Sequence, residues 1–176
     1  MRNEFQGSAE FFRERVGCLT ASNMWRAMQF LKNGSEGAER RGLKIELLAD
    51  AVPHFVTPAM QWGIDQEAVG KRAVEEATGE IIRNVGFIRH PAIENCGASP
   101  DGFIGDDRGF ELKCPTTTKH LTWLLAGVVP EEHKPQMLLG MACTGRKSWE
   151  FASFDPRLPP KQRLFMRNFT PKPEEI

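Results

Sequence analysis

The stretch "SPDGFIGDDRGFELKCP", residues 99–115, places an aspartate in a turn and then an acid and a lysine in a short strand. Side chains alternate between the two faces of a strand, so Glu111 and Lys113 share one face while Leu112 points to the other. Buried charge is costly without a partner, and a divalent metal ion would satisfy the two acids, Asp101 and Glu111. The stretch therefore predicts a strand that carries a charged site.

Asp101, Glu111 and Lys113 form a set that metal-dependent phosphodiester hydrolysis can use. Two carboxylates hold Mg²⁺, or Mn²⁺ in its place, and leave coordination positions for water and phosphate. A lysine two residues along the strand can orient that water and offset charge at the phosphate. An acid followed by x-Lys is a weak pattern alone, but the proline and glycine that bracket Asp101 favour a specific turn.

Length and composition predict one soluble domain spanning residues 1–176. Lysine plus arginine and aspartate plus glutamate each number 23, so a nucleic-acid site must come from local segregation of charge. No apolar run approaches the roughly 18 residues of a membrane span, and the N-terminus lacks a secretory signal, which favours the cytoplasm. The four cysteines are scattered without any C-x-x-C pair, which favours reduced thiols over a zinc site or a disulfide framework.

Periodicity and turn residues predict an α/β or α+β fold, with a central mixed sheet flanked by helices. Thr20 or Ser22 is a candidate N-cap, and Gly79 is a candidate helix end. The expected helices cover 8–16, 20–32, 38–52, 59–79, 116–127 and 130–145. The expected strands cover 80–90, 95–99, 102–105, 109–114, 147–154 and 162–169.

Glu67 stands out in the helix predicted for 59–79, because it falls on the apolar stripe with Ile64 and Val74. One explanation is an i,i+4 ion pair with Lys71, which would contribute only about 0.2–0.5 kcal/mol. The other is that Glu67 joins the acids of the 99–115 stretch in one site. The helix pattern alone favours the ion pair.

Seven blocks of sequence, in order, resemble the phage lambda-type exonucleases, a branch of the PD-(D/E)XK nuclease superfamily used in viral recombination. This resemblance implies the restriction-endonuclease-like fold and a Mg²⁺-dependent exonuclease. Such an enzyme digests the 5′-phosphorylated strand of a DNA duplex in the 5′-to-3′ direction and leaves 3′ overhangs for strand annealing. The blocks are "RVGCLTAS" (15–22), "MQWGIDQE" (60–67), "GFIRHP" (86–91), "GASPDGFI" (97–104), "ELKCP" (111–115), "GVVPEEHKPQ" (127–136) and "GRKSWEFASFDPR" (145–157).

The resemblance also implies roles for single residues of the catalytic centre. Asp101, Glu111 and the backbone carbonyl of Leu112 would hold two Mg²⁺ ions, with Mn²⁺ as a substitute. Glu67 would complete the site from its helix. Lys113 would be the catalytic lysine.

A second set, Arg15, Ser22, Ser99 and Gln136, resembles the family's pocket for the terminal 5′ phosphate. Arginine suits this role because its guanidinium binds phosphate through two hydrogen bonds. Helix capping by Ser22 and a simple turn at Ser99 remain alternatives. Phe11 stands where the family has a tryptophan and can still stack on a base.

The resemblance implies that the protein acts on double-stranded DNA ends as a homotrimer and passes its product to a phage single-strand annealing protein. It would be phage- or prophage-encoded and work in the bacterial cytoplasm, with no membrane partner. His133 departs from the family, which has a tyrosine there. Two alternatives stay open: a structure-specific or restriction-type endonuclease of the same superfamily, and a non-catalytic DNA-binding protein.

Overall fold

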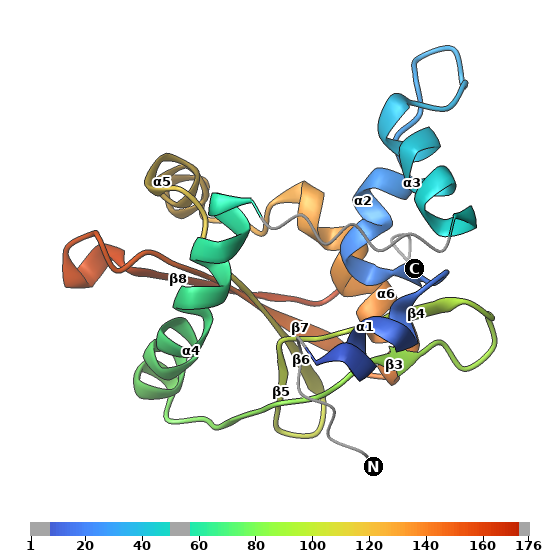
Figure 1. The fold of residues 1–176 in the computed structure, drawn as a ribbon. Coiled ribbons are helices and arrows are strands. Elements are labelled where there is room, and N and C mark those ends of the chain that lie inside the picture. Colours follow the sequence, from blue (N-terminus) through green and yellow to red (C-terminus); the bar gives the residue numbers. More distant parts are fainter. Residues whose placement is uncertain (1–7, 50–56, 173–176) are drawn as a thin grey trace. The chain divides into compact units, whose positions relative to one another are not determined.

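A computed structural model describes residues 8–49 and 57–172 (Figure 1). The chain divides into two compact units, each assembled from three stretches. Met1–His54, Val85–Pro100 and Glu131–Gly145 form the first unit; Phe55–Asn84, Asp101–Pro130 and Arg146–Ile176 form the second. The boundary between Pro100 and Asp101 falls inside the stretch 99–115, so the strand with Glu111 and Lys113 belongs to the second unit.

The second unit is built on a five-stranded mixed sheet with the order β2-β5-β6-β7-β8. Strands β6 and β7 are parallel and the other neighbours are antiparallel. The strands are β2 (Ile82–Arg83), β5 (Gly102–Ile104), β6 (Arg108–Lys113), β7 (Ser148–Phe154) and β8 (Leu164–Phe169). The helices are α4 (Pro58–Thr78), α5 (Thr117–Ala126) and the short 3₁₀ helix η3 (Pro160–Gln162). The predicted mixed sheet flanked by helices is confirmed.

Helices α4 and α5 cover opposite faces of this sheet (Figure 1). Val74 of α4 packs in a core cluster with Leu112 of β6 and Phe154 of β7. On α5, Trp123 packs edge-on against Phe151 of β7, with ring centroids 5.6 Å apart. Because neighbouring strand positions alternate in facing, Glu111 and Lys113 lie on the face opposite Leu112. Helix α4 ends where the sequence predicts, since Gly79 adopts the left-handed conformation at φ 72°.

The first unit holds a three-stranded sheet, β1-β4-β3, with α6 packed against β4 and η1. Strand β1 runs parallel to β4, and β3 runs antiparallel to it. The strands are β1 (Leu19–Thr20), β3 (Ile88–Arg89) and β4 (Cys96–Ala98). The helices are α1 (Ala9–Arg15), η1 (Ala21–Asn23), α2 (Met24–Ala27), α3 (Ala38–Leu48), η2 (Glu131–His133) and α6 (Lys134–Thr144).

Several predicted elements are wrong in part. The helix predicted over 20–32 is replaced by η1, the short α2 and then a hairpin in which Phe30 pairs with Glu36. The hairpin forms because Gly34 takes φ 80° and the Leu31 amide donates to the Ser35 carbonyl at 2.8 Å. The strand predicted over 80–90 splits into β2 and β3, which join different sheets. Helix α3 ends at Leu48, and residues 50–52 of the predicted helix lie outside the described residues.

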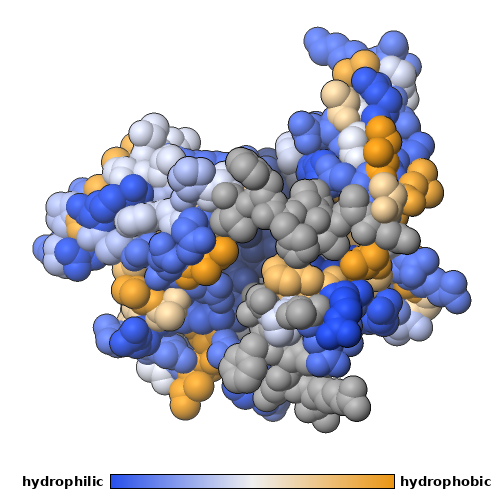
Figure 2. Space-filling model, viewed as in Figure 1, coloured by the Kyte–Doolittle hydropathy of each residue, from blue (hydrophilic) through white to orange (hydrophobic). Residues whose placement is uncertain are grey.

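The segment that carries α2 and α3 exposes hydrophobic side chains among charged ones (Figure 2). The exposed large apolar residues of this segment are Trp25, Met28, Phe30, Leu31, Ile45 and Leu48. The four cysteines are free thiols, as predicted. Within the described ranges, no helix is both long and apolar enough to cross a membrane.

Candidate active site

Strand β6 places Glu111 and Lys113 on one face, as the alternation predicts. The Glu111 carboxylate is 2% exposed, and the Lys113 ammonium donates a hydrogen bond to its Oε1 atom. Burial would lower the pKa of Lys113, but the negative charges of Glu111 and Asp101 outweigh it and raise that pKa. The lysine is therefore a fixed positive charge beside a buried carboxylate.

Asp101 is tied to the same strand through the backbone. Its amide donates to the carbonyl of Phe110 at 3.1 Å, and the Leu112 amide donates to Asp101 Oδ2 at 2.7 Å. Burial, followed by the negative charge of Glu111 and a smaller contribution from Glu67, raises the pKa of Asp101 to about 8. Glu111 and Glu67 thus both disfavour the charged form of Asp101, and a cation there would relieve this repulsion.

Glu67 forms the ion pair of the first explanation, and its membership of a common site with the other acids stays a prediction. Its carboxylate pairs with Lys71 of the same helix at 2.7 Å, as the i,i+4 spacing predicts. Its charge also contributes to the raised pKa of Asp101 and of Cys114. The charge of Glu67 on α4 therefore acts on Asp101, while the carboxylate itself is engaged by Lys71.

The donor atoms of this region suit a hard divalent cation. Burial, reinforced by the charges of Asp101 and Glu67, raises the pKa of the Cys114 thiol to about 12, so this sulfur stays protonated at neutral pH. Carboxylate oxygens remain as ligands, which fits magnesium or manganese better than zinc. Across residues 8–49 and 57–172, no three acid, histidine or cysteine side chains form a ready-made metal site. Lys113, Lys71 and the Leu112 amide instead engage the three carboxylates.

Arg15 lies in the last turn of α1, in the first unit. Burial lowers the pKa of its guanidinium, which lies 4.8 Å from the centre of the Phe11 ring. Phe11 is only 4% exposed and also packs edge-on against Phe12. The Phe11 ring therefore packs against the Arg15 guanidinium. Base stacking by Phe11 stays a prediction.

The other predicted phosphate-binding residues lie on elements of the first unit that pack together. Ser22 is in η1, Ser99 follows β4, and Gln136 is in α6, which contacts both η1 and β4. Ser22 is exposed and its hydroxyl lies 3.1 Å from that of Thr20, so it caps neither η1 nor α2. The Ser99 hydroxyl is buried and has no hydrogen-bond partner in the part of the chain described. A buried hydroxyl without a partner fits a ligand-binding role.

The structure adds residues that the sequence analysis did not single out. Asp155 is fully buried just after β7, and Arg157 binds it through a double hydrogen bond. The Arg157 guanidinium also lies 4.4 Å from the centre of the Trp62 ring on α4. Trp62 lies in the block "MQWGIDQE" and Arg157 in the block "GRKSWEFASFDPR", but the sequence of neither block indicates that these two side chains are in contact.

Comparisons with known proteins indicate the family and the fold of the chain. Residues 10–147 match the family model described as YqaJ-like viral recombinase domain. The chain is similar to LHK-Exo in a crystal structure with dAMP, at 34% identity and a TM-score of 0.87 over 96% of this chain and 85% of that one. A structure of the alkaline exonuclease LHK-Exo from Laribacter hongkongensis gives 35% identity and a TM-score of 0.85, over 94% and 83%.

A phage related exonuclease from Haemophilus somnus 129PT shares the fold at 12% identity and a TM-score of 0.65, over 90% of this chain and 86% of that one. The comparison with curated proteins gives no match. The predicted PD-(D/E)XK-like fold is confirmed by the two LHK-Exo structures.

Proposed function

We propose that this chain, which belongs to the YqaJ-like viral recombinase family with the lambda-type exonucleases, is a Mg²⁺-dependent 5′-to-3′ exonuclease of duplex DNA. Membership of this family makes the chain a nuclease; the metal, the direction and the product are the proposal. One observation carries it: the buried carboxylates of Asp101 and Glu111 act together on the ammonium of Lys113, and the charge of Glu67 acts on Asp101. Digestion of the 5′-phosphorylated strand would leave 3′ overhangs for strand annealing.

The chain's own residues divide the catalytic work. Asp101, Glu111, Glu67 and the Leu112 carbonyl would hold one or two Mg²⁺ ions, and Mn²⁺ could replace them. When bound, such an ion polarises phosphoryl oxygens and lowers the pKa of a bound water. Lys113, held by Glu111, donates hydrogen bonds to the attacking water or to a phosphate oxygen, where negative charge develops.

The first unit would recognise the DNA end through its terminal 5′ phosphate. Arg15, Ser22, Ser99 and Gln136 would bind the terminal 5′ phosphate, and the buried Ser99 hydroxyl has no hydrogen-bond partner within the described residues. A similar structure holds dAMP, a nucleotide of the kind this reaction would release. This supports a nucleotide as the product.

One set of substrates tests the proposed activity. The protein is incubated with Mg²⁺ and a 5′-phosphorylated linear duplex, its 3′-phosphorylated counterpart or a closed circle. We expect mononucleotide release from the 5′-phosphorylated duplex alone. Cutting of the circle would favour the endonuclease alternative, and binding without any cutting would favour the non-catalytic one.

Assembly belongs to the same proposal. A chain with 23 positive and 23 negative residues gains little from non-specific attraction to DNA, so continued digestion needs another means of retaining the duplex. A closed homotrimer around the DNA provides it, and a phage single-strand annealing protein in the bacterial cytoplasm would take the product. Light scattering at micromolar concentration should give the mass of a trimer; a monomer mass would rule the ring out.

A further inference from the structure

A cavity of about 240 Å³ lies in the second unit, where the chain leaves the end of β6. Its lining comes from the start of α4, from the segment after β6 and from Arg157 after β7. The lining residues are Ala59, Trp62, Cys114, Pro115, Thr116 and Arg157. Cys114, Pro115 and Thr116 directly follow Lys113 along the chain. The cavity is therefore lined by the segment that leaves the end of the strand carrying Glu111 and Lys113.

Arg157 is held rigidly at this cavity. Its Nε atom donates to Asp155 Oδ1 at 2.7 Å, and Nη2 donates to Asp155 Oδ2 and to the Pro115 carbonyl, each at 3.0 Å. Thr117 donates to the same Asp155 carboxylate at 2.6 Å. None of the hydrogen bonds that Arg157 forms within the described chain uses Nη1. The guanidinium is fixed in orientation and keeps one donor group for a ligand.

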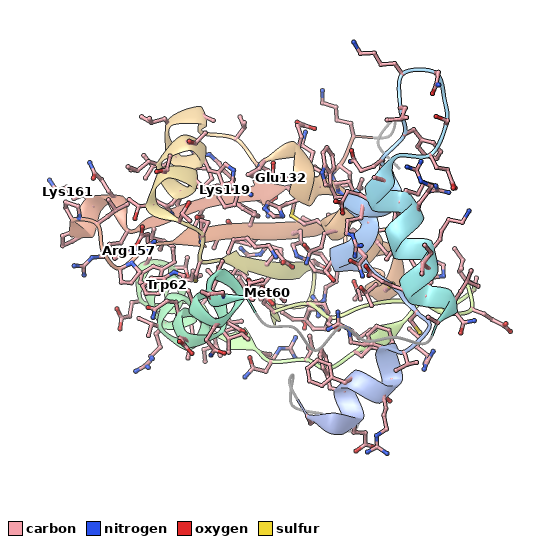
Figure 3. The ribbon with its side chains drawn as sticks, turned by 45° about the horizontal axis from the view of Figure 1, so that its top comes forward. Met60, Trp62, Lys119, Glu132, Arg157 and Lys161 are labelled. Carbon is pink, nitrogen blue, oxygen red and sulfur yellow. The ribbon has the colours of Figure 1, made fainter. Side chains whose placement is uncertain are left out.

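The guanidinium stacks on the Trp62 indole, so two planar groups lie together at the cavity (Figure 3). Nucleobases stack on aromatic rings and on arginine planes alike. The other walls, Ala59, Cys114 and Pro115, offer mainly apolar contact. At about 240 Å³ the space is smaller than the roughly 300–1,000 Å³ that holds drug-sized ligands. It suits one ring system better than an entire nucleotide.

We propose that this cavity is the subsite for the base of the nucleotide that is being removed. The inference rests on the proposed exonuclease function. A terminal nucleotide must leave the duplex stack before its phosphodiester bond reaches the acids, and unstacking costs a few kcal/mol. The Trp62–Arg157 platform, beside the segment that follows Lys113, recovers that stacking in the bound state. Its walls are mainly apolar, and a single free donor group on Arg157 can bond to an acceptor that every base offers, so the subsite accepts all four bases and favours purines through their larger area.

The test removes the base and the indole separately and together. Two 5′-phosphorylated duplexes are compared, one with a normal terminal nucleotide and one with an abasic terminal nucleotide, in single-turnover release with Mg²⁺. In the wild type we expect the missing base to slow release about tenfold. Trp62→Ala should slow release of the normal nucleotide by a similar factor and show no further loss with the abasic end. Trp62→Phe should keep most of the wild-type rate.

Controls separate this subsite from a structural role and from the proposed function. Trp25→Ala removes an exposed indole of the first unit and should leave the abasic effect unchanged. Thermal melting checks that each variant is folded. An equal abasic effect in the wild type and in folded Trp62→Ala would overturn the subsite. If the wild type digests neither duplex, the exonuclease proposal fails, and calorimetry then tests the base subsite separately. The wild type should bind dAMP about tenfold tighter than deoxyribose 5-phosphate. Trp62→Ala should bind the two compounds equally.

Discussion

At the scale of single residues, Glu111 and Lys113 have separable roles because one supplies oxygen ligands and the other a positive charge. We expect Glu111→Ala and Lys113→Ala each to abolish nucleotide release while the protein stays folded. Glu111→Ala should also weaken Mn²⁺ binding measured by calorimetry, whereas Lys113→Ala should retain it. Nuclease rates like those of the wild type in Glu111→Ala would refute the site.

Arg15 provides a second residue-scale prediction, because a half-buried guanidinium can discriminate between phosphorylated and unphosphorylated ends. A hydrogen bond to a charged group contributes about 1.5–3 kcal/mol, so Arg15→Ala should reduce the preference for phosphorylated ends roughly 10- to 100-fold. The measurement is the ratio of initial rates on the two ends. Arg13→Ala, in the same helix but exposed, is the matched control. Equal losses on both ends would assign Arg15 to structure or to internal phosphates.

At the scale of elements, the contact between α4 and β6 depends on a glycine. A Cβ atom at Gly70 would come within 2.8 Å of Leu112 Cδ2 and 3.3 Å of Phe154 Cβ, whereas one at Gly63 meets nothing within 4 Å. Gly63→Ala should stabilise the helix by about 0.5–1 kcal/mol and raise Tm. Gly70→Ala should lower Tm, because overpacking costs about 1–3 kcal/mol, more than the helix gains. A higher Tm for both variants would contradict this prediction, because it would show that α4 can move away from β6 and accommodate the added methyl group without cost.

The junction of β7 and α5 predicts a pH effect. Burial acts to raise the pKa of Asp155, but the hydrogen bonds from Arg157 and Thr117 outweigh it and hold that pKa at about 2, below its usual 3.8. A folded-state pKa below the unfolded one stabilises the protein above the unfolded value, and that contribution disappears as pH falls through the folded value.

Asp155→Asn should therefore lower the free energy of unfolding by about 2 kcal/mol at pH 7. The deficit relative to the wild type should shrink as pH falls from about 4 to about 2. Urea denaturation of both proteins at pH 7, 4 and 3 measures it. A deficit that does not change with pH would mean that the carboxylate's charge contributes nothing.

At the scale of the whole molecule, the chain passes between the two units five times. Neither unit is one continuous stretch, so we expect the whole chain to fold as a single nuclease domain. Calorimetry should show one transition whose calorimetric and van't Hoff enthalpies agree. Two separated transitions would show that the units unfold independently.

Elements governed by neighbours along the chain could be predicted from the sequence. The end of α4 follows from Gly79, and the shared face of Glu111 and Lys113 follows from strand alternation. The hairpin at Phe30 and the short strand β1 were not predicted. Strand β1 exists because Leu19 and Thr20 pair with Cys96 and Gly97, far along the chain.

The candidate site divides in the same way. Its acids and Lys113 follow from a strand pattern and a family resemblance, both of which are present in the sequence. Three features appear only in the folded chain. They are the contact of Trp62 with Arg157, the buried Asp155 that binds Arg157, and the Ser99 hydroxyl without a partner in the described residues. Alternation and helix capping act over a few residues, so a sequence displays them. Which distant side chains meet depends on how sheets and helices pack, and the tertiary structure alone decides that.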